Sequence, residues 1–433
     1  MNVCQWRTAN TNVSELFVRI LIVSPVYPPE QPPAGINVAE LASELAQARH
    51  DVTVLTGFPS HPSGRLFKGW KARLVTKERT PESFTLLRCI HSFVPRFGSL
   101  GKLWYHFTFA VSLFFTGLRA GRFDVLVLQS TPAFCGPAAI LLAGIKKAKT
   151  FYWIHDIHPE SAINAGLLKE GALSALMKAV DTWVCRKAST VAALTEDMRE
   201  VILARGLPAE HVIIQRHWLD EERIRPSLRQ NAWREKHGVA LESFVVLHAG
   251  TIGYVSGALV IVEAAKLLAK HPGILFLIVG DGPLKGDLQE KAAQYGLANV
   301  KFLPFQSEED LNEMQASGDV GLVTLQPRSG HTSIPSKIHG YTAAGRPVIA
   351  SVDPTSSTAR LIDEGGFGWV APPGDPEALA GAILHAAANP DECRRRGEKA
   401  REFFLREFGR RAVTAEFRRK LESLPSERGG CRG

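Results

Sequence analysis

Short apolar runs alternate with amphipathic segments along most of this chain, and the alternation begins twice. In the first half the expected strands are 19–24, 51–56, 86–90, 124–129, 150–155, 190–194 and 212–215. In the second half they are 244–249, 275–279, 300–302, 320–324, 348–351 and 368–370. Short β-rich runs separated by helical stretches are typical of parallel βαβ units. We therefore predict an α/β protein with two doubly wound, Rossmann-like parallel sheets.

Amphipathic stretches with a helical pattern lie between these runs. In the first half they include 38–48 and 173–186, and in the second half they are 258–269, 284–295, 308–317 and 377–388. The charged, aperiodic segment 217–234 is the expected linker. It separates an N-terminal domain, 18–216, from a C-terminal domain, 235–400, and the charged tail 401–433 is expected to be helical and to cross back to the first domain. Ligands of such sheets gather at the carboxyl ends of the strands, where the two domains would face each other across a cleft.

Composition limits the class of protein. A length of 433 residues suits two domains, and 45% hydrophobic residues is typical of a globular chain. The six cysteines form no C-x-x-C pair or His-spaced cluster, which indicates free thiols in a reducing compartment. Residues 1–17 lack the apolar core of a signal peptide, and no run of about 20 apolar residues predicts a spanning helix. We expect a cytoplasmic protein.

The net charge of +8 is concentrated in the first 200 residues. No nucleic-acid motif accompanies it, so we expect no nucleic-acid partner. Basic residues interleave with aromatic ones there, which favours peripheral association with an anionic membrane surface. The alternative is an ordinary solvated face above core aromatics. The candidate membrane and acceptor face comprises Lys68, Trp70, Lys71, Arg96, Lys102 and Trp104.

The segment 334–350 predicts a loop, a short helix, a Gly-Arg-Pro turn and a buried strand. Pro335 suits a first helical position, so the free N–H groups of Ser336 and Lys337 would face a ligand that carries phosphate. Together with the Gly-Asp-Gly-Pro turn at 280–283 and the Pro-Pro-Gly-Asp-Pro run at 372–376, this segment resembles the donor half of family-4 glycosyltransferases of the GT-B fold. The polysaccharide-biosynthesis branch of that family (colanic acid and O-antigen type) is the most similar.

Further donor-site residues follow from this resemblance. The loop with Gly250, Thr251 and Gly253 follows the first strand of the second half, as the donor loop of the family does. The resemblance also implies roles for Gly280 and Gly282 under the donor, for Phe305 and Gln306 beside the base, and for Arg328 with Lys337 at the diphosphate. The chain departs from the family pattern in lacking the loop Arg and Lys, where it has Thr251 and Ser256. It also has Thr332 and Gly340 where many relatives have two glutamates, and no carboxylate near Ser357.

Two motifs of the first half complete the candidate site. Gly35 ends a Pro-rich segment after the first strand, before a helix expected near Asn37, and resembles the N-terminal glycine loop of the family; a connector without function is the alternative. His155 and Asp156 end a buried strand, where His155 could exchange protons or bond sugar hydroxyls and Asp156 could orient it. A metal site or a polar strand end are the alternatives. The resemblance places both residues at the acceptor and the transferred sugar.

The resemblance implies an activity. It is the transfer of a sugar, with retention at the anomeric carbon, from a nucleoside diphosphate donor, with UDP expected, to a polyprenyl-diphosphate-linked acceptor. No cofactor and no metal are expected. A nucleotide-sugar epimerase and a non-catalytic nucleotide-sugar-binding subunit are the alternatives. A Rossmann dehydrogenase is disfavoured because neither half opens with a full G-x-G-x-x-G fingerprint.

Overall fold

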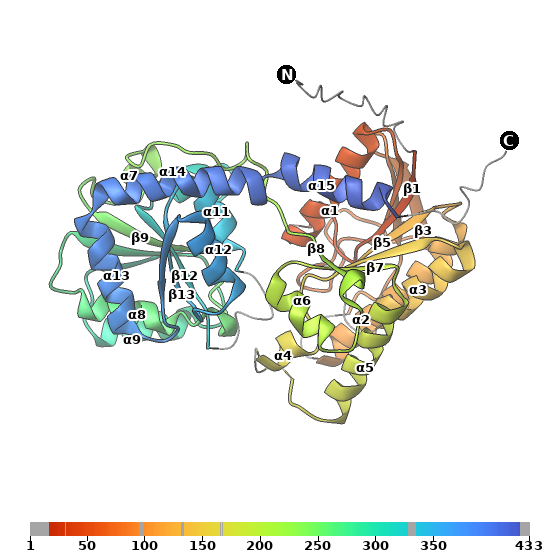
Figure 1. The fold of residues 1–433 in the computed structure, drawn as a ribbon, viewed down its shortest axis with the longest axis horizontal. Helices are drawn as coiled ribbons and strands as arrows, with labels where there is room; N and C mark the ends of the chain where they lie inside the picture. Colours follow the sequence, from red (N-terminus) through yellow and green to blue (C-terminus); the bar gives the residue numbers. More distant parts are fainter. Residues whose placement is uncertain are drawn as a thin grey trace, which may run out of the picture. The chain divides into compact units, whose positions relative to one another are not determined.

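The computed structural model describes residues 17–424, except 31, 95–98, 131–133, 165, 167 and 328–334, and except the side chains of 99, 100 and 102. The described chain contains two sheets covered by helices (Figure 1). The expected α/β class with two doubly wound sheets is confirmed.

The first sheet has eight strands in the order β3-β4-β2-β1-β5-β6-β7-β8. The pairs β1–β2, β2–β4, β6–β7 and β7–β8 are parallel, and β3 is antiparallel to β4. Its elements are β1 (Arg19–Val23), α1 (Pro33–Gln47), β2 (Asp51–Gly57), β3 (Val75–Arg79), β4 (Thr85–Cys89), α2 (Ser99–Arg119), β5 (Val125–Gln129), α3 (Cys135–Lys146), β6 (Lys149–Trp153), α4 (Glu160–Asn164), α5 (Ala172–Lys187), β7 (Thr190–Ala193), α6 (Glu196–Leu203) and β8 (Val212–Ile214).

The second sheet has six parallel strands in the order β11-β10-β9-β12-β13-β14. The order reverses between β9 and β12, and ligands bind doubly wound sheets at the carboxyl ends of the strands that flank such a point. The elements are α7 (Ala232–Lys236), β9 (Phe244–Ala249), α8 (Leu259–Leu267), β10 (Ile274–Val279), α9 (Lys285–Gln294), β11 (Val300–Leu303), α10 (Leu311–Ala316), β12 (Val320–Thr324), α11 (Lys337–Ala343), β13 (Val348–Ser351), α12 (Ser357–Gly365), β14 (Gly368–Ala371), α13 (Pro376–Ala388), α14 (Pro390–Glu407) and α15 (Arg410–Glu422).

Alternate residues of the second sheet point into two separate cores. Val245 and Leu247 of β9 pack with α11, α12 and α14 on one face, whereas Val246 packs with α8, α9 and α13 on the other. Burial on both faces explains why these strands read as continuous apolar runs rather than alternating ones. The glycine loops at the carboxyl ends of β9 and β10 therefore rest on a sheet that is packed on both sides.

The structure adds to the sequence prediction near the first sheet, where helices α2, α3, α4 and α6 were not among the stretches named as helical. Strand β3, Val75–Arg79, was not predicted, because its exposed and mostly polar residues lack the apolar run of a buried strand and it pairs only at the sheet edge. Helix α1 begins at Pro33 rather than near Asn37, because Pro33 takes the first helical position, where a missing N–H costs nothing.

The chain divides into two compact units. One comprises residues 1–127, 141–150 and 418–433, and the other comprises 128–140 and 151–417. Within the second unit, the ring of Phe417 on α15 lies 4.9 Å from that of Phe151 and 5.0 Å from that of Trp153, both on β6. The last three residues of the expected linker 217–234 belong to helix α7, Ala232–Lys236. The domain boundaries expected from the sequence stay a prediction.

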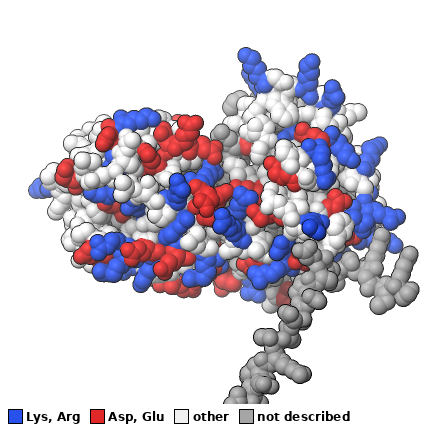
Figure 2. Space-filling view, turned by 90° about the horizontal axis from the view of Figure 1, so that it is seen from above, with Lys and Arg blue, Asp and Glu red and all other residues white. Residues whose placement is uncertain are grey.

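The charges on the face shown in Figure 2 follow the distribution along the sequence. Acidic and basic side chains are mixed over the part on the left, whereas Lys and Arg are more prominent on the right. The expected membrane residues Lys68 and Lys71 are exposed in the first unit. Trp70 is partly buried, and the guanidinium of Arg88 lies 4.9 Å from its ring centroid.

Candidate active site

Two glycine loops lie against each other at the carboxyl ends of β9 and β10. The amide of Gly250 donates to Val279 O at 2.8 Å, and the amide of Ile252 donates to Asp281 O at 2.9 Å. Gly280 has a φ of +147°, and a Cβ there would lie 2.0 Å from the carbonyl oxygen of Gly250. Only glycine allows the two backbones to approach this closely.

Replacing Gly280 with Ala is expected to lower the free energy of unfolding by about 3 kcal/mol or more, because the methyl group meets backbone and the φ is unfavourable for alanine. Gly286→Ala on α9 is the matched control, since a Cβ there meets open space and the change raises helix propensity. Urea unfolding of both variants measures the difference. Equal midpoints for Gly280→Ala and the natural chain would contradict the steric account.

Lys337 lies against the first of these loops. Its Nζ donates to the carbonyl oxygen of Thr251 at 3.1 Å, and its Cε would lie 3.2 Å from a Cβ on Gly250. Burial lowers the pKa of Lys337 to about 8, because the ammonium group is partly removed from water. A half-buried cation beside a glycine backbone, which allows a ligand to approach closely, can bind a phosphate or diphosphate.

The other predicted donor residues differ in whether their side chains are exposed or already hydrogen-bonded within the protein. Thr251 is exposed, and Gly253 precedes a 3-10 turn at Tyr254–Ser256. The hydroxyl of Ser256 is buried and donates to Gly253 O at 2.6 Å. Ser256 therefore closes the turn of its own loop, and Thr251 is the hydroxyl that remains at the surface.

Phe305 and Gln306 follow β11, and Ser336 precedes α11. The ring of Phe305 is 58% exposed, which leaves one face open to a planar ligand. The side-chain oxygen of Gln306 instead accepts from Nε1 of the buried Trp233 at 2.9 Å, so this side chain anchors α7. Ser336 is exposed beside Lys337. The predicted residues Arg328 and Arg96 and the side chain of Lys102 lie outside the described part of the chain.

His155 lies two residues after the end of β6, and its ring contacts a second histidine. Its amide donates to Ser130 Oγ at 2.9 Å, and its Nδ1 lies 2.9 Å from Nε2 of His217. One of these two ring nitrogens donates and the other accepts, so the tautomers of the two rings are linked. In the described part of the chain Nε2 of His155 is enclosed and has no hydrogen-bond partner. The residue that orients His155 is therefore His217, and the sequence prediction that Asp156 does so is not reflected in its hydrogen bonds.

Burial keeps this group of histidines neutral. It lowers the pKa of His155 to about 3 and that of His339, on α11, to about 4. The pKa of His217 lies well below its usual range because of burial and because His155 and His339 are close. His155 is thus a neutral hydrogen-bonding group at pH 7 rather than a charged imidazolium that could act as a general acid. Asp156 is exposed, and its pKa is raised because surrounding protein displaces water, with His158 opposing this shift.

A buried carboxylate joins the beginnings of α6 and α12. Asp197 accepts the amide of Ser357 at 2.7 Å and binds the guanidinium of Arg360. The Asp197 amide in turn lies 3.1 Å from Ser357 Oγ. The carboxylate that the family pattern has near Ser357 is absent from the sequence, and the structure brings Asp197 there from a position far away in the chain. No sequence pattern indicated this contact.

Gly35 belongs to the first unit and lies in the first turn of α1. A Cβ there would come within 3.1 Å of the backbone of Val26 and Tyr27, so the helix packs tightly on the loop after β1. This packing explains why a glycine is needed at position 35, whether or not a ligand binds there. Its predicted part in donor binding stays a prediction.

In the described ranges, no group of three or more His, Cys, Asp or Glu side chains is placed to hold a metal ion. The expectation of a metal-independent reaction stays a prediction.

A doubly wound sheet with two interlocked glycine loops and a half-buried lysine at its carboxyl edge is an arrangement typical of α/β proteins that bind nucleotides. Residues 34–216 match the description "Glycosyl transferase 4-like domain", and residues 229–403 match "Glycosyl transferases group 1". The chain belongs to the GT-B glycosyltransferases of family 4, as its motifs predicted, and is an enzyme of this class.

Individual relatives agree with this assignment. The chain is 27% identical over 412 residues to the putative colanic acid biosynthesis glycosyl transferase WcaI of Escherichia coli K12, covering 92% of this chain and 98% of WcaI. It is 27% identical to the probable glycosyltransferase WbjE of Pseudomonas aeruginosa, over 66% of this chain and 70% of WbjE. The crystal structure of Anabaena HepE in complex with UDP-glucose superimposes with a TM-score of 0.68 at 18% identity, over 94% of this chain and 100% of HepE, which shows the shared fold.

Proposed function

We propose that this glycosyltransferase moves a sugar from a UDP-linked donor to a polyprenyl-diphosphate-linked acceptor during the assembly of a cell-surface polysaccharide. The observation that carries the proposal is the position of Lys337 Nζ at the Gly250–Thr251 loop, where a diphosphate would neutralise a half-buried cation. The names of two relatives support it, since WcaI is described for colanic acid biosynthesis and HepE was crystallised with UDP-glucose.

The resemblance to the family supports retention at the anomeric carbon and metal independence. In such a reaction the leaving diphosphate must be stabilised by protein groups, and Lys337 would supply the charge, since the amides of Gly250 and Ile252 already donate to backbone carbonyl oxygens. His155, neutral and with a free Nε2, would bond a hydroxyl of the transferred sugar.

A thermal-shift panel in the presence of EDTA tests the donor. UDP is expected to raise the melting temperature by several degrees when its concentration is about 100 times the dissociation constant, and UMP by much less, because it lacks the phosphate that Lys337 would bind. Release of UDP from UDP-sugars with a lipid acceptor then tests transfer. No shift with any nucleotide would contradict the proposal, and binding without transfer would favour a non-catalytic subunit.

The membrane part of the proposal is supported by helix α2. None of the described helices combines the length and apolar character needed to cross a membrane. One side of α2 is nevertheless exposed and apolar, with Trp104 at 52%, Phe107 at 44% and Phe115 at 53% exposure. These residues are spaced by three and eight along a helix and share one face, while Phe109 on the other face is fully buried. An interfacial helix has this pattern.

Replacing Trp104 and Phe107 together with Ala is expected to weaken binding to phosphatidylglycerol-containing vesicles by about ten- to a hundredfold, because two aromatic side chains would no longer enter the lipid interface. Flotation of the protein with the vesicles measures this. Leu74→Ala, at a position 78% exposed and outside α2, is the matched control. Equal flotation of the double variant and the natural chain would remove α2 from the membrane contact.

A further inference from the structure

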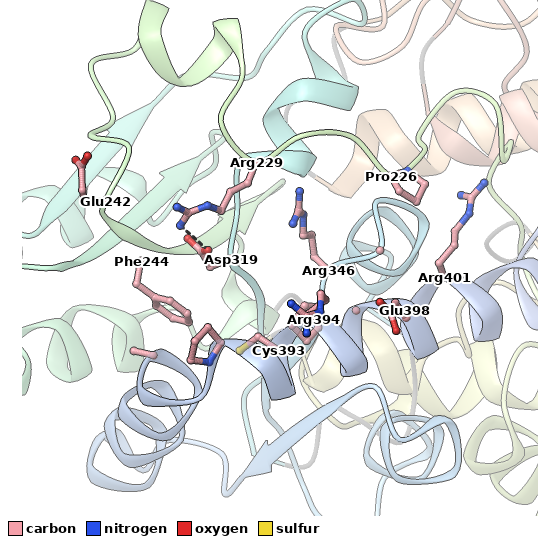
Figure 3. A pocket seen from close by; sticks show the side chains of 15 residues that line it. Pro226, Arg229, Glu242, Phe244, Asp319, Arg346, Cys393, Arg394, Glu398 and Arg401 are labelled. Atoms are coloured by element: carbon pink, nitrogen blue, oxygen red, sulfur yellow. Dashed lines mark hydrogen bonds and ion pairs between the residues drawn. The ribbon is translucent and has the colours of Figure 1, made fainter.

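A cavity lies at the edge of the second sheet opposite to the glycine loops (Figure 3). Its volume is about 680 Å³, which is in the range of small-molecule sites of roughly 300–1,000 Å³. Phe244 begins β9, Asp319 directly precedes β12 and Pro347 directly precedes β13, so the cavity is at the amino ends of these strands. Lys337 and the Gly250 loop are at their carboxyl ends, so this cavity is separate from the donor site.

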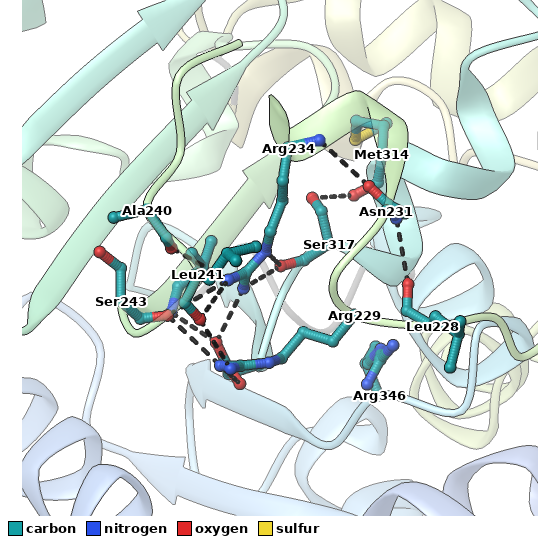
Figure 4. A network of polar contacts seen from close by, with 12 residues as sticks. Leu228, Arg229, Asn231, Arg234, Ala240, Leu241, Ser243, Met314, Ser317 and Arg346 are labelled. Carbon is teal, nitrogen blue, oxygen red and sulfur yellow. Dashed lines mark hydrogen bonds and ion pairs between the residues drawn. The ribbon is translucent and has the colours of Figure 1, made fainter. Parts of the chain in front are cut away.

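Positive charge exceeds negative charge in the wall of this cavity. Asp319 accepts from Arg229 at 2.8 Å, from Arg234 at 3.0 Å and from the amide of Val245 at 2.7 Å (Figure 4). One carboxylate is therefore shared by two guanidinium groups. The remaining wall carboxylates, Glu242 and Glu398, are exposed and lie where water screens them.

Arg346 is the cation that this arrangement leaves without a counter-charge. In Figure 3 it lies between Asp319 and the α14 residues Arg394 and Glu398. Its Nη2 donates to Ser227 O at 2.8 Å, but among the described residues it makes no ion pair, and its enclosed Nε has no hydrogen-bond partner. Burial lowers the pKa of Arg346, and Arg234 and Arg229 lower it further, with Asp319 opposing them.

A second arginine of the wall, Arg401, hydrogen-bonds backbone carbonyl oxygens and makes no ion pair within the described ranges, although the charges of Glu221 and Glu222 partly balance it. Arg401 on α14 donates to the carbonyl oxygens of Ala343 at 2.8 Å and Ile224 at 3.1 Å. Burial lowers its pKa as well. Arg394, by contrast, is exposed and pairs with Asp391 at 3.0 Å. An anion inside the cavity would therefore pair with Arg346, while Arg229 and Arg401 would add to the positive electrostatic potential.

The turn that carries Arg346 is held in place by close packing. Gly345 has a φ of +66°, and a Cβ on Gly397 of α14 would lie 2.4 Å from its carbonyl oxygen. The backbone before Arg346 is thereby pressed against α14 with no room for a side chain between them. A site whose cation rises from a fixed turn is preorganised for binding.

The apolar part of the wall indicates what kind of anion would fit. Phe244, Ala387, Pro390 and Cys393 line the cavity together with the arginines. An inorganic phosphate would occupy only a part of this volume and would leave the apolar wall empty. We propose that the cavity binds a small organic phosphate, with its phosphate at Arg346 and its organic part against Phe244 and Ala387.

Calorimetric titration of the full chain with phenyl phosphate tests this proposal. Saturable binding is expected, and Arg346→Gln should weaken it at least tenfold, whereas Arg395→Gln, an exposed arginine of α14 outside the cavity wall, should leave it unchanged. Ala387→Trp fills the cavity without removing a charge and should also abolish binding. This second variant keeps the test valid if Arg346→Gln fails to fold.

Three outcomes would overturn the proposal. They are the absence of saturable binding to the natural chain, binding that both Arg346→Gln and Ala387→Trp retain, and binding that Lys337→Ala loses while Arg346→Gln keeps it. The last result would assign the phosphate to the donor site. Succinate that binds as tightly as phenyl phosphate would overturn the choice of a phosphate over a dicarboxylate.

Discussion

Replacing Lys337 with Ala is expected to raise the KM for the nucleotide sugar and to lower kcat, so that kcat/KM falls about 100- to 1,000-fold. The ammonium group lies at the Gly250–Thr251 loop and is partly shielded from water, which strengthens its attraction for a diphosphate. That attraction increases as the sugar–phosphate bond breaks and the leaving group gains charge. Steady-state rates of UDP release at varied donor concentration measure both constants.

The pH profile separates a charge effect from a structural one. Because burial lowers the pKa of Lys337 to about 8, the free enzyme loses this positive charge as the pH rises through 8. We therefore expect kcat/KM for the donor to be full below pH 8 and to fall above it. Lys337→Arg, which stays charged, should lose this break. Lys270→Ala, at an exposed position, is the control, and unchanged kinetics of Lys337→Ala would remove Lys337 from the site.

Replacing His155 with Ala is expected to lower kcat about a hundredfold, the low end of what one preorganised hydrogen-bonding group contributes, with a smaller change in the donor KM. The neutral ring would bond the sugar through its free Nε2 while Nδ1 is held by His217. His155→Gln places a side-chain amide there, which can still hydrogen-bond the sugar, and should recover part of the rate. The transfer of labelled sugar to the lipid acceptor measures kcat.

His217 provides a further comparison for His155. As a positioning residue, its replacement by Ala should lower kcat less than His155→Ala, while His271→Ala at an exposed site should change nothing. If His155→Ala transferred sugar at the natural rate, the assignment of this strand end to the transferred sugar would be wrong.

The strands show how far local pattern predicts this fold. A strand buried on both faces, such as Phe244–Ala249, is a continuous apolar run and was expected with the same ends. The expected strands 320–324 and 348–351 also have the observed ends, and the remaining ones are present with ends shifted by a residue or two. The polar edge strand Val75–Arg79 could not be expected, because its pairing with β4 is the only feature that makes it a strand.

The candidate site was predictable where the chemistry lies in one short segment. Glycines directly after strands indicated the loops at 250 and 280, and the Ser-Lys pair at a helix start indicated Lys337. Contacts such as those between His155 and His217, or Asp197 and Ser357, join residues far apart in the chain. No local pattern marks either partner.

The sequence by itself thus determined the two doubly wound sheets, the family and the strand ends at which a ligand would bind, because periodicity, glycine position and short motifs are local properties of the chain. Only the tertiary structure decided which polar groups have partners. It gave His155 a histidine partner, engaged the hydroxyl of Ser256 in its own turn, and, as far as the chain is described, left Arg346 without an ion pair, since Asp319 already binds Arg229 and Arg234. Pairing and burial depend on distances between remote residues, and packing of the sheets sets those distances.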